Sequence, residues 1–226
     1  MFEQRNLISA PVIDENNQLV GRITIDDVVD VIRDQAEHSV MSMVGLDEDE
    51  DVFAPIIQSS KRRSVWLGVN LVTAFIAVYF IGLFEATLQQ KIALAILMPV
   101  VASMGGIAGT QTLIIVTRGI ATGRVTTANI KTLINKEVAV SGLNGIIWSI
   151  VIGLITYYWF ADLLLSLIIA LAIITNLVVA AFSGAFLPLL LSKLKIDPAL
   201  AGGVILTTIT DVIGFVAFLG LAALFI

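Results

Sequence analysis

Five long apolar stretches constrain the fold of this chain more than any other feature. A membrane-crossing helix needs about 20 predominantly apolar residues, and each stretch is at least that long. Charged residues make up only 14% of the chain, against about 25% in soluble domains. We therefore predict an all-α polytopic membrane protein with five transmembrane helices. The predicted spans cover residues 64–84, 92–117, 138–161, 163–192 and 198–226.

Acidic residues are concentrated before the first apolar stretch. The net charge is −5, and 13 of the 18 acidic side chains precede residue 64. Within this part, residues 11–37 predict a strand, a turn, a second strand and a helix that Thr24 caps. The chain is thus expected to have a small α/β segment over residues 1–40, an acidic linker over residues 41–63, and a membrane domain over residues 64–226.

The basic residues predict the orientation in the membrane, because short cytoplasmic loops are enriched in Lys and Arg. Nine of them fall on one side of the predicted spans and only Lys91 falls on the other. We expect a cytoplasmic N-terminus and an external C-terminus. The nine are Lys61, Arg62, Arg63, Arg118, Arg124, Lys131, Lys136, Lys193 and Lys195.

Asp211 is the strongest functional candidate, because it lies in the middle of the last span. A carboxylate at the bilayer centre costs about 2.5–3.5 kcal/mol even on lenient insertion scales, so it usually faces water, a cation or a partner. At about 100° per residue, small and hydroxylated residues share its sector of the helix. A structural Asp hydrogen-bonded to a neighbouring helix, with small residues for close packing, is the alternative. The predicted pore-lining residues here are Gly203, Thr207, Thr210 and Gly214.

The second span carries a proline and several glycines, which favour an interrupted helix. Freed carbonyl groups at membrane depth would line a cavity and suit a hard cation; a proline kink packed against a neighbour is the alternative. With no Cys and one His, softer metals lack their preferred ligands. Mg²⁺ that keeps most of its water is favoured, and Ca²⁺, Mn²⁺ and Na⁺ stay open. The predicted pore-lining residues here are Pro99, Gly105, Gly106 and Gln111.

Acidic residues recur on one face of the helix predicted after Thr24. Asp27, Asp30 and Asp34 are spaced by three and four residues, and like charges at these spacings destabilise an isolated helix. A solvated face is the commonest explanation of such a row, and the functional interpretation is a regulatory site that binds a divalent cation. The acidic run at residues 47–51 is interpreted as a solvated linker or as part of the same regulatory surface.

Several motifs resemble those of the MgtE-type magnesium channels. Residues 19–30 look like the closing strand and helix of a cystathionine-β-synthase (CBS) domain. Ile107 stands where the family pattern has Asn after Gly-Gly. The other motifs are Pro99 to Gln111, Thr117-Arg-Gly-Ile-Ala-Thr-Gly123, Lys136-Glu137, Gly184 to Pro188, Asp197-Pro-Ala199 and Thr207-Thr-Ile-Thr-Asp-Val-Ile-Gly214.

The resemblance implies a homodimer with an ion pathway at its two-fold axis, in which Asp211 holds hydrated Mg²⁺. It implies that residues 1–40 are the C-terminal part of a CBS domain and that residues 51–63 form a plug-like connecting helix. Asp27 and Asp30, with Asp34, would bind the cytosolic Mg²⁺ that closes the pore. Thr24 and Asp27 also resemble the ribose-contacting residues of nucleotide-binding CBS domains.

We therefore predict a Mg²⁺ channel or transporter of the cytoplasmic membrane, gated by cytosolic Mg²⁺. It is not expected to be an enzyme, because the spans contain no nucleophile–base pair and no zinc-binding constellation. The expected partners are a second copy of the chain, Mg²⁺ and the lipid bilayer, and no nucleic acid. The alternatives are a proton- or sodium-coupled divalent cation exporter and a CBS-linked membrane sensor that does not conduct.

Overall fold

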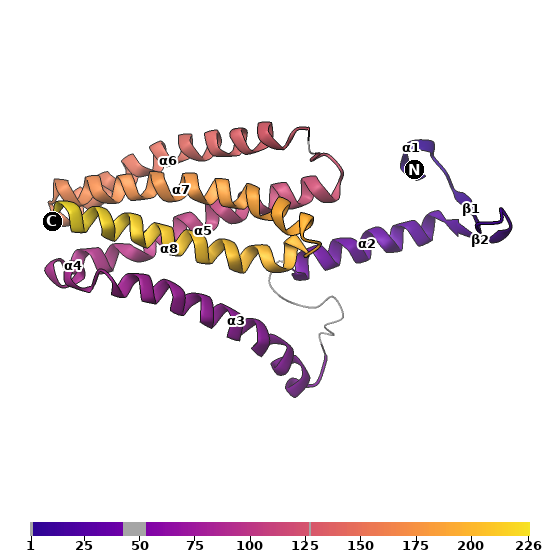
Figure 1. Ribbon diagram of the computed structural model, residues 1–226, viewed down its shortest axis with the longest axis horizontal. Coiled ribbons are helices and arrows are strands. Elements are labelled where there is room, and N and C mark those ends of the chain that lie inside the picture. Colours follow the sequence, from indigo (N-terminus) through magenta and orange to yellow (C-terminus); the bar gives the residue numbers. More distant parts are fainter. Residues whose placement is uncertain (1, 43–52, 127) are drawn as a thin grey trace. The chain divides into compact units, whose positions relative to one another are not determined.

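The predicted fold class is confirmed (Figure 1). The computed structural model describes residues 2–42, 53–126 and 128–226. Among these residues, five helices are long and apolar enough to cross a membrane, and a two-stranded sheet precedes them. The chain divides into two compact units, Met1–Ser59 and Ser60–Ile226.

The first unit consists of a short helix, a hairpin and a longer helix. The elements are α1 (Phe2–Arg5), β1 (Ser9–Ile13), β2 (Leu19–Thr24) and α2 (Ile25–Ser42). β1 and β2 pair antiparallel, with Ser9 opposite Thr24. Asp14 closes the hairpin turn, because its Oδ1 accepts hydrogen bonds from the backbone N–H groups of Asn16 (2.9 Å) and Gln18 (2.8 Å). The predicted order of strand, turn, strand and helix is confirmed.

The first unit has no buried core among its described side chains. Val31 and Ile32, on the apolar stripe of α2, are 65% and 62% exposed. Two strands and one helix are too few to cover an apolar face. The acidic run at residues 47–51, which we interpret as a linker or part of a regulatory surface, lies outside the described residues.

The second unit is a bundle of long helices, and its helix bounds differ in part from the predicted spans. α3 runs unbroken from Ile56, so the end of the predicted connecting helix and the first span are one helix. α6 likewise begins before residue 138, because Lys131 and Lys136 extend the helix beyond its apolar part. The elements are α3 (Ile56–Gly82), α4 (Glu85–Gln90), α5 (Ile92–Ala121), α6 (Ile130–Phe160), α7 (Leu163–Lys193) and α8 (Pro198–Phe225).

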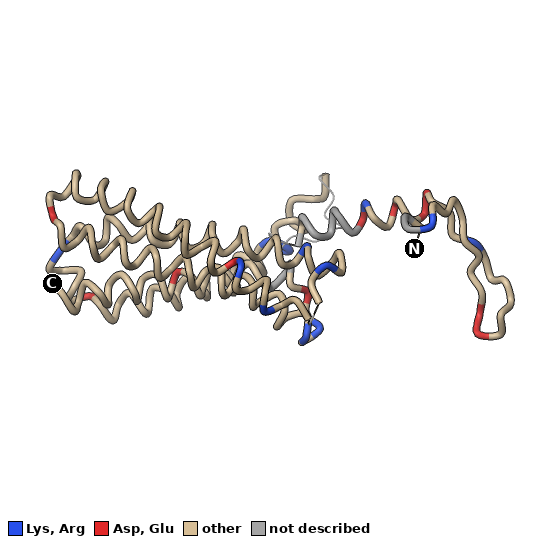
Figure 2. The backbone as a smooth tube through the Cα atoms, turned by 90° about the horizontal axis from the view of Figure 1, so that it is seen from above, with Lys and Arg blue, Asp and Glu red and all other residues tan. Residues whose placement is uncertain are grey.

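α7 is the central helix of the second unit (Figure 1). It packs against α5, α6 and α8, and α5 also packs against α8. Half of its most apolar window is buried, whereas Ala77 is the only described residue of α3 that is buried. In this unit, most charged residues lie toward the ends of the helices (Figure 2). The apolar middle of the bundle matches the hydrocarbon layer of a membrane.

α5 is a continuous helix through Pro99, so the predicted interruption of the second span is wrong. Proline removes one helical hydrogen bond, and unpaired backbone groups are costly in hydrocarbon, so the rest of the ladder is kept. The glycines have a packing role at two positions. Gly105 and Gly109 are buried, and a Cβ on Gly109 would lie 3.1 Å from the Leu206 side chain of α8.

Candidate functional site

Asp211 lies near the middle of α8, on a side of the helix that the bundle covers only partly. Asp211 and Thr207, one turn earlier, are both half-buried, as is Gly203 one turn before that. Thr210 and Gly214 are buried instead, and a Cβ on Gly214 would meet Asn176 of α7 and Val101 of α5. The sector predicted as one pore-lining face therefore contains both a half-buried row and a packed row.

The hydroxyl groups of α8 donate to the helix backbone. Thr207 Oγ1 lies 3.1 Å from the Gly203 oxygen and 3.0 Å from the Val204 oxygen. Thr210 Oγ1 donates to the Thr207 oxygen over 3.0 Å. Because each hydroxyl has only one proton, its free lone pairs can accept hydrogen bonds from water. The half-buried Thr207 thus presents an acceptor one turn from the carboxylate of Asp211.

The carboxylate of Asp211 forms no hydrogen bond or ion pair with any side chain or backbone group that the structure describes. A half-buried charge in an apolar helix is stable only with compensation from water, a cation or another chain. No three His, Cys, Asp or Glu side chains gather into a metal-binding group among the described residues. Asp211 is therefore suited to an outer-sphere contact with a hydrated ion rather than to a multi-ligand cage.

Asn176 of α7 is a buried polar residue that sequence reasoning did not identify as important. Its side-chain Nδ2 donates to the carbonyl oxygen of Val101 on α5 over 2.9 Å. A Cβ on Gly214 would lie 2.6 Å from this nitrogen, and a Cβ on Gly105 would overlap it. Asn176 thus occupies the space that the two glycines leave between α5, α7 and α8. The sequence could have pointed to Asn176, because it is the only residue with a side-chain amide within residues 163–192.

The other residues predicted to line the pore lie in different environments. Gly105 and Gly214 are buried in contact with Asn176. Pro99 and Gln111 are exposed on α5. Gly106 is half-buried, and a Cβ added to it would have no atom within 4 Å. The pore-lining role of this set stays a prediction.

A cavity of about 350 Å³ lies between α5 and α6, and Gln111 is one of the residues that line it. Glu137 of α6 also lines it, together with the polar residues Ser141 and Asn144. Glu137 is only 5% exposed, and its Oε1 lies 3.4 Å from Nζ of Lys136. The structure thus places an acid of the membrane unit, Glu137, at a mainly apolar cavity.

The predicted regulatory acids lie on α2 of the first unit. Asp27, Asp30 and Asp34 are all exposed. The carboxylate of Asp27 already has a partner nearby, because its Oδ2 accepts hydrogen bonds from the backbone N–H and the hydroxyl of Thr24, both over 2.8 Å. These bonds hold the pKa of Asp27 below its ordinary value of 3.8. Thr24 directly precedes α2, at the predicted N-cap position, and Asp27 reaches back to the Thr24 N–H as in a capping box.

Comparisons with known proteins bear on the membrane unit and on the whole chain. Residues 98–221 match the family model MgtE, described as a divalent cation transporter. The magnesium transporter MgtE of Bacillus subtilis (strain 168) is 33% identical over 226 residues, which are 100% of this chain and 50% of that protein. The magnesium transporter MgtE of Thermus thermophilus is 30% identical over 217 residues, 95% of this chain and 48% of that protein. The chain spans about half the length of the curated relatives it matches.

Proposed function

The chain belongs to the MgtE family of divalent cation transporters, and from that premise we propose that its membrane unit conducts Mg²⁺, with Asp211 as the carboxylate that holds the ion. The observation that carries this proposal is the half-buried Asp211 carboxylate, which has no partner among the described residues. The curated relatives are magnesium transporters by name. Mg²⁺ is the cargo in this proposal, and no covalent catalysis is involved.

The chemistry of α8 favours a hydrated ion. Mg²⁺ gives up its water reluctantly and is held by one or two carboxylates with the water shell kept. Asp211 provides one such carboxylate, and Thr207 provides an acceptor for hydrogen bonds from the water shell. In a homodimer with the half-buried sides of α8 facing each other, the pathway would contain two carboxylates at one level. We propose this arrangement for the pore.

The proposed orientation places the N-terminus in the cytoplasm and the C-terminus outside, as the basic residues between the helices favour. The chain has no Cys, so single cysteines report sidedness cleanly. Ser192→Cys near the end of α7 should be labelled from the cytoplasmic side by an impermeant thiol reagent. Gln90→Cys in α4 should be labelled from outside. Labelling in the reverse pattern contradicts the orientation.

Regulation by cytosolic Mg²⁺ is proposed to act through the exposed acids of α2, within a partial CBS domain. Asp30 and Asp34 are the sharper test residues, because Asp27 already caps the helix. Asp30→Asn with Asp34→Asn should raise the cytosolic Mg²⁺ concentration at which the pore closes. Flux whose Mg²⁺ dependence is unchanged in this double variant contradicts the regulatory role but not conduction.

Conduction is tested by Mg²⁺ uptake into proteoliposomes that contain an entrapped Mg²⁺-sensitive dye. Asp211→Asn should abolish uptake driven by a potassium diffusion potential, with the amount of inserted protein unchanged. Glu85→Gln is the matched control, because Glu85 is an exposed acid of the same unit and its loss should leave uptake intact. Uptake at the wild-type rate in Asp211→Asn contradicts the site.

The same liposomes separate the alternatives. Uptake that requires a proton or sodium gradient and not a membrane potential would favour a coupled exporter. Liposomes of pure protein that never admit Mg²⁺ would favour a membrane sensor that does not conduct.

A further inference from the structure

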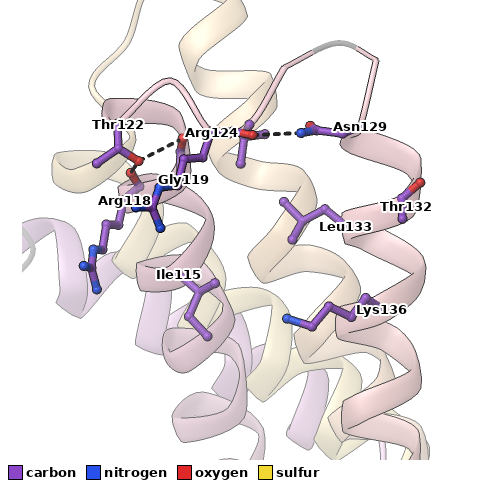
Figure 3. Close-up of a pocket in the computed structure, with 10 residues that line it drawn as sticks. Ile115, Arg118, Gly119, Thr122, Arg124, Asn129, Thr132, Leu133 and Lys136 are labelled. Atoms are coloured by element: carbon purple, nitrogen blue, oxygen red, sulfur yellow. Dashed lines mark hydrogen bonds between the residues drawn. The ribbon is translucent and has the colours of Figure 1, made fainter. Parts of the chain in front are cut away.

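A second cavity of the membrane unit, the α5–α6 pocket, has a basic lining. It measures about 460 Å³ and lies between the C-terminal end of α5 and the N-terminal end of α6 (Figure 3). Arg118, Arg124 and Lys136 line it, and none of the described lining residues is acidic. The ion pathway proposed above requires the opposite charge, so this basic lining is unsuited to it.

The connection between α5 and α6 folds back and fixes the pocket wall. The backbone N–H groups of Arg124 and Val125 both donate to the Gly119 oxygen over 2.9 Å. Asn129 Oδ1 accepts from the Thr126 N–H over 2.8 Å. Its Nδ2 donates to the Arg124 oxygen, also over 2.8 Å (Figure 3). This network holds the backbone of Arg124 beside the end of α5.

The same connection satisfies carbonyl groups that would repel an anion. The C-terminal carbonyls of a helix carry partial negative charge. At α5, the Arg118 oxygen accepts from both the backbone N–H and the hydroxyl of Thr122, over 3.0 and 2.8 Å. The Ile120 oxygen accepts from the Gly123 N–H over 3.0 Å. The positive side chains therefore dominate the potential in the pocket.

The charges of the pocket are largely uncompensated. Lys136 lies 3.4 Å from Glu137, so its charge is partly neutralised. Arg118 and Arg124 are exposed, and neither forms an ion pair with a residue that the structure describes. Two guanidinium groups can bind phosphate oxygens through paired N–H donors.

The position of the pocket favours a lipid. α5 and α6 are both of membrane-spanning length, so their connected ends lie where the hydrocarbon layer meets water. The apolar side chains of Ile115, Val125 and Leu133 are interspersed with the basic ones in the lining. The headgroup and acyl chains of an anionic lipid offer both charge and hydrocarbon to such a lining. We propose that the α5–α6 pocket binds a phosphate group carried by the headgroup of an anionic phospholipid.

The test uses the full chain in nanodiscs that contain phosphatidylglycerol and phosphatidylcholine in equal amounts. Native mass spectrometry after transfer to detergent counts the phosphatidylglycerol molecules that stay bound. Arg118→Gln with Arg124→Gln should reduce the retained fraction by about tenfold or more, since two cations near an anionic headgroup are lost. Lys193→Gln with Lys195→Gln removes the same charge from exposed positions at the end of α7 and should retain the lipid.

Further arms separate the two sources of phosphate and guard against misfolding. In nanodiscs of phosphatidylcholine alone, inorganic phosphate that raises the melting temperature of the wild type, but not of Arg118→Gln with Arg124→Gln, would support a phosphate site filled from solution. Arg118→Lys with Arg124→Lys should keep most of the lipid and shows that the positions tolerate change. Equal retention by the wild type and the Gln variant overturns the proposal. Equal loss in the Lys193 and Lys195 control also overturns it, because surface charge alone would then explain binding.

Discussion

The side-chain amide of Asn176 on α7 donates a hydrogen bond to the carbonyl oxygen of Val101 on α5, with 2.9 Å between nitrogen and oxygen. Asn176 is completely buried, and its Oδ1 has no hydrogen-bond partner among the described residues. Small residues on α5 and α8 make room for it. This contact joins three helices at one point, so the bundle should be sensitive to changes there.

Replacement of Asn176 by Ala should destabilise the membrane unit. The variant loses a bond between helices, which is worth about 0.6 kcal/mol on average and up to about 1.7 kcal/mol in membrane proteins, and it leaves a cavity. Thr175→Ala is the control, because Thr175 is exposed and bonds within its own helix. The free energy of unfolding in mixed micelles measures both variants. Equal stability of the two would contradict the role of Asn176.

Gly214→Ala should be destabilising only while Asn176 is present. The added Cβ would lie 2.6 Å from Asn176 Nδ2, and overpacking of this kind costs about 1–3 kcal/mol. In an Asn176→Ala background the clashing nitrogen is gone, so the same substitution should cost much less. A double-mutant cycle on the unfolding free energy measures this coupling. Strictly additive effects would mean that Gly214 is needed for another reason, such as the ion pathway.

Gly184→Ala should weaken the contact between α5 and α7. The new Cβ would lie 2.6 Å from the backbone oxygen of Gly109 and 3.1 Å from the Thr112 Cβ. Because backbone atoms cannot rotate away, the two helices must separate, at a cost of about 1–3 kcal/mol. Gly142→Ala on α6, with no atom within 4 Å of its Cβ position, is the matched control. A loss of stability no larger than that of the control would refute the close approach.

The sequence predicted the spans because their length and apolar character depend on each segment alone. It did not predict the start of α3 at Ile56, since polar residues can extend a membrane helix into the interface. The helical period placed Gly214 and Asp211 in one sector, yet one is buried and the other half-buried. That difference depends on where α7 meets α8, which no single helix encodes. Asn176 was missed for the same reason: its partners lie on α5 and α8, far away in sequence.

Asp162 should make the stability of the bundle dependent on pH. Its Oδ1 accepts from the Leu165 N–H at the start of α7 over 3.0 Å, and its Oδ2 accepts from Nζ of Lys91. The first bond, and then the second, hold the pKa of Asp162 below 3.8. Because the folded-state pKa is the lower one, the stabilisation is complete above the unfolded-state pKa and is lost as the pH falls through the folded-state pKa.

Two substitutions of Asp162 separate its roles. Asp162→Asn keeps a side-chain oxygen for the helix cap but loses the ion pair, so its stability should depend less on pH below about 4. Asp162→Ala also loses the cap and should cost about 1 kcal/mol more. Thermal unfolding in detergent, scanned about once per pH unit from about pH 3 to about pH 7, measures the stability of both variants. The same pH profile in the wild type and in Asp162→Asn would rule out a contribution from this carboxylate.

Asp27 should titrate below its ordinary pKa of 3.8, because Thr24 donates two hydrogen bonds to it. The lowered pKa means that this cap is fully formed above the unfolded-state pKa and disappears as the pH falls through the folded-state pKa. The side-chain carboxyl carbons of ¹³C-labelled aspartates report the titration by NMR on the full chain in detergent.

Thr24→Val isolates the contribution of the hydroxyl, because the backbone N–H of residue 24 remains and no charge changes. The pKa of Asp27 should rise toward its ordinary value in this variant, but not reach it, since the backbone bond is the larger cause of the shift. The signals of the remaining aspartates serve as internal controls. A titration of Asp27 that is unaffected by Thr24→Val would contradict the bond from the hydroxyl and leave the backbone N–H of residue 24 as the partner that lowers the pKa.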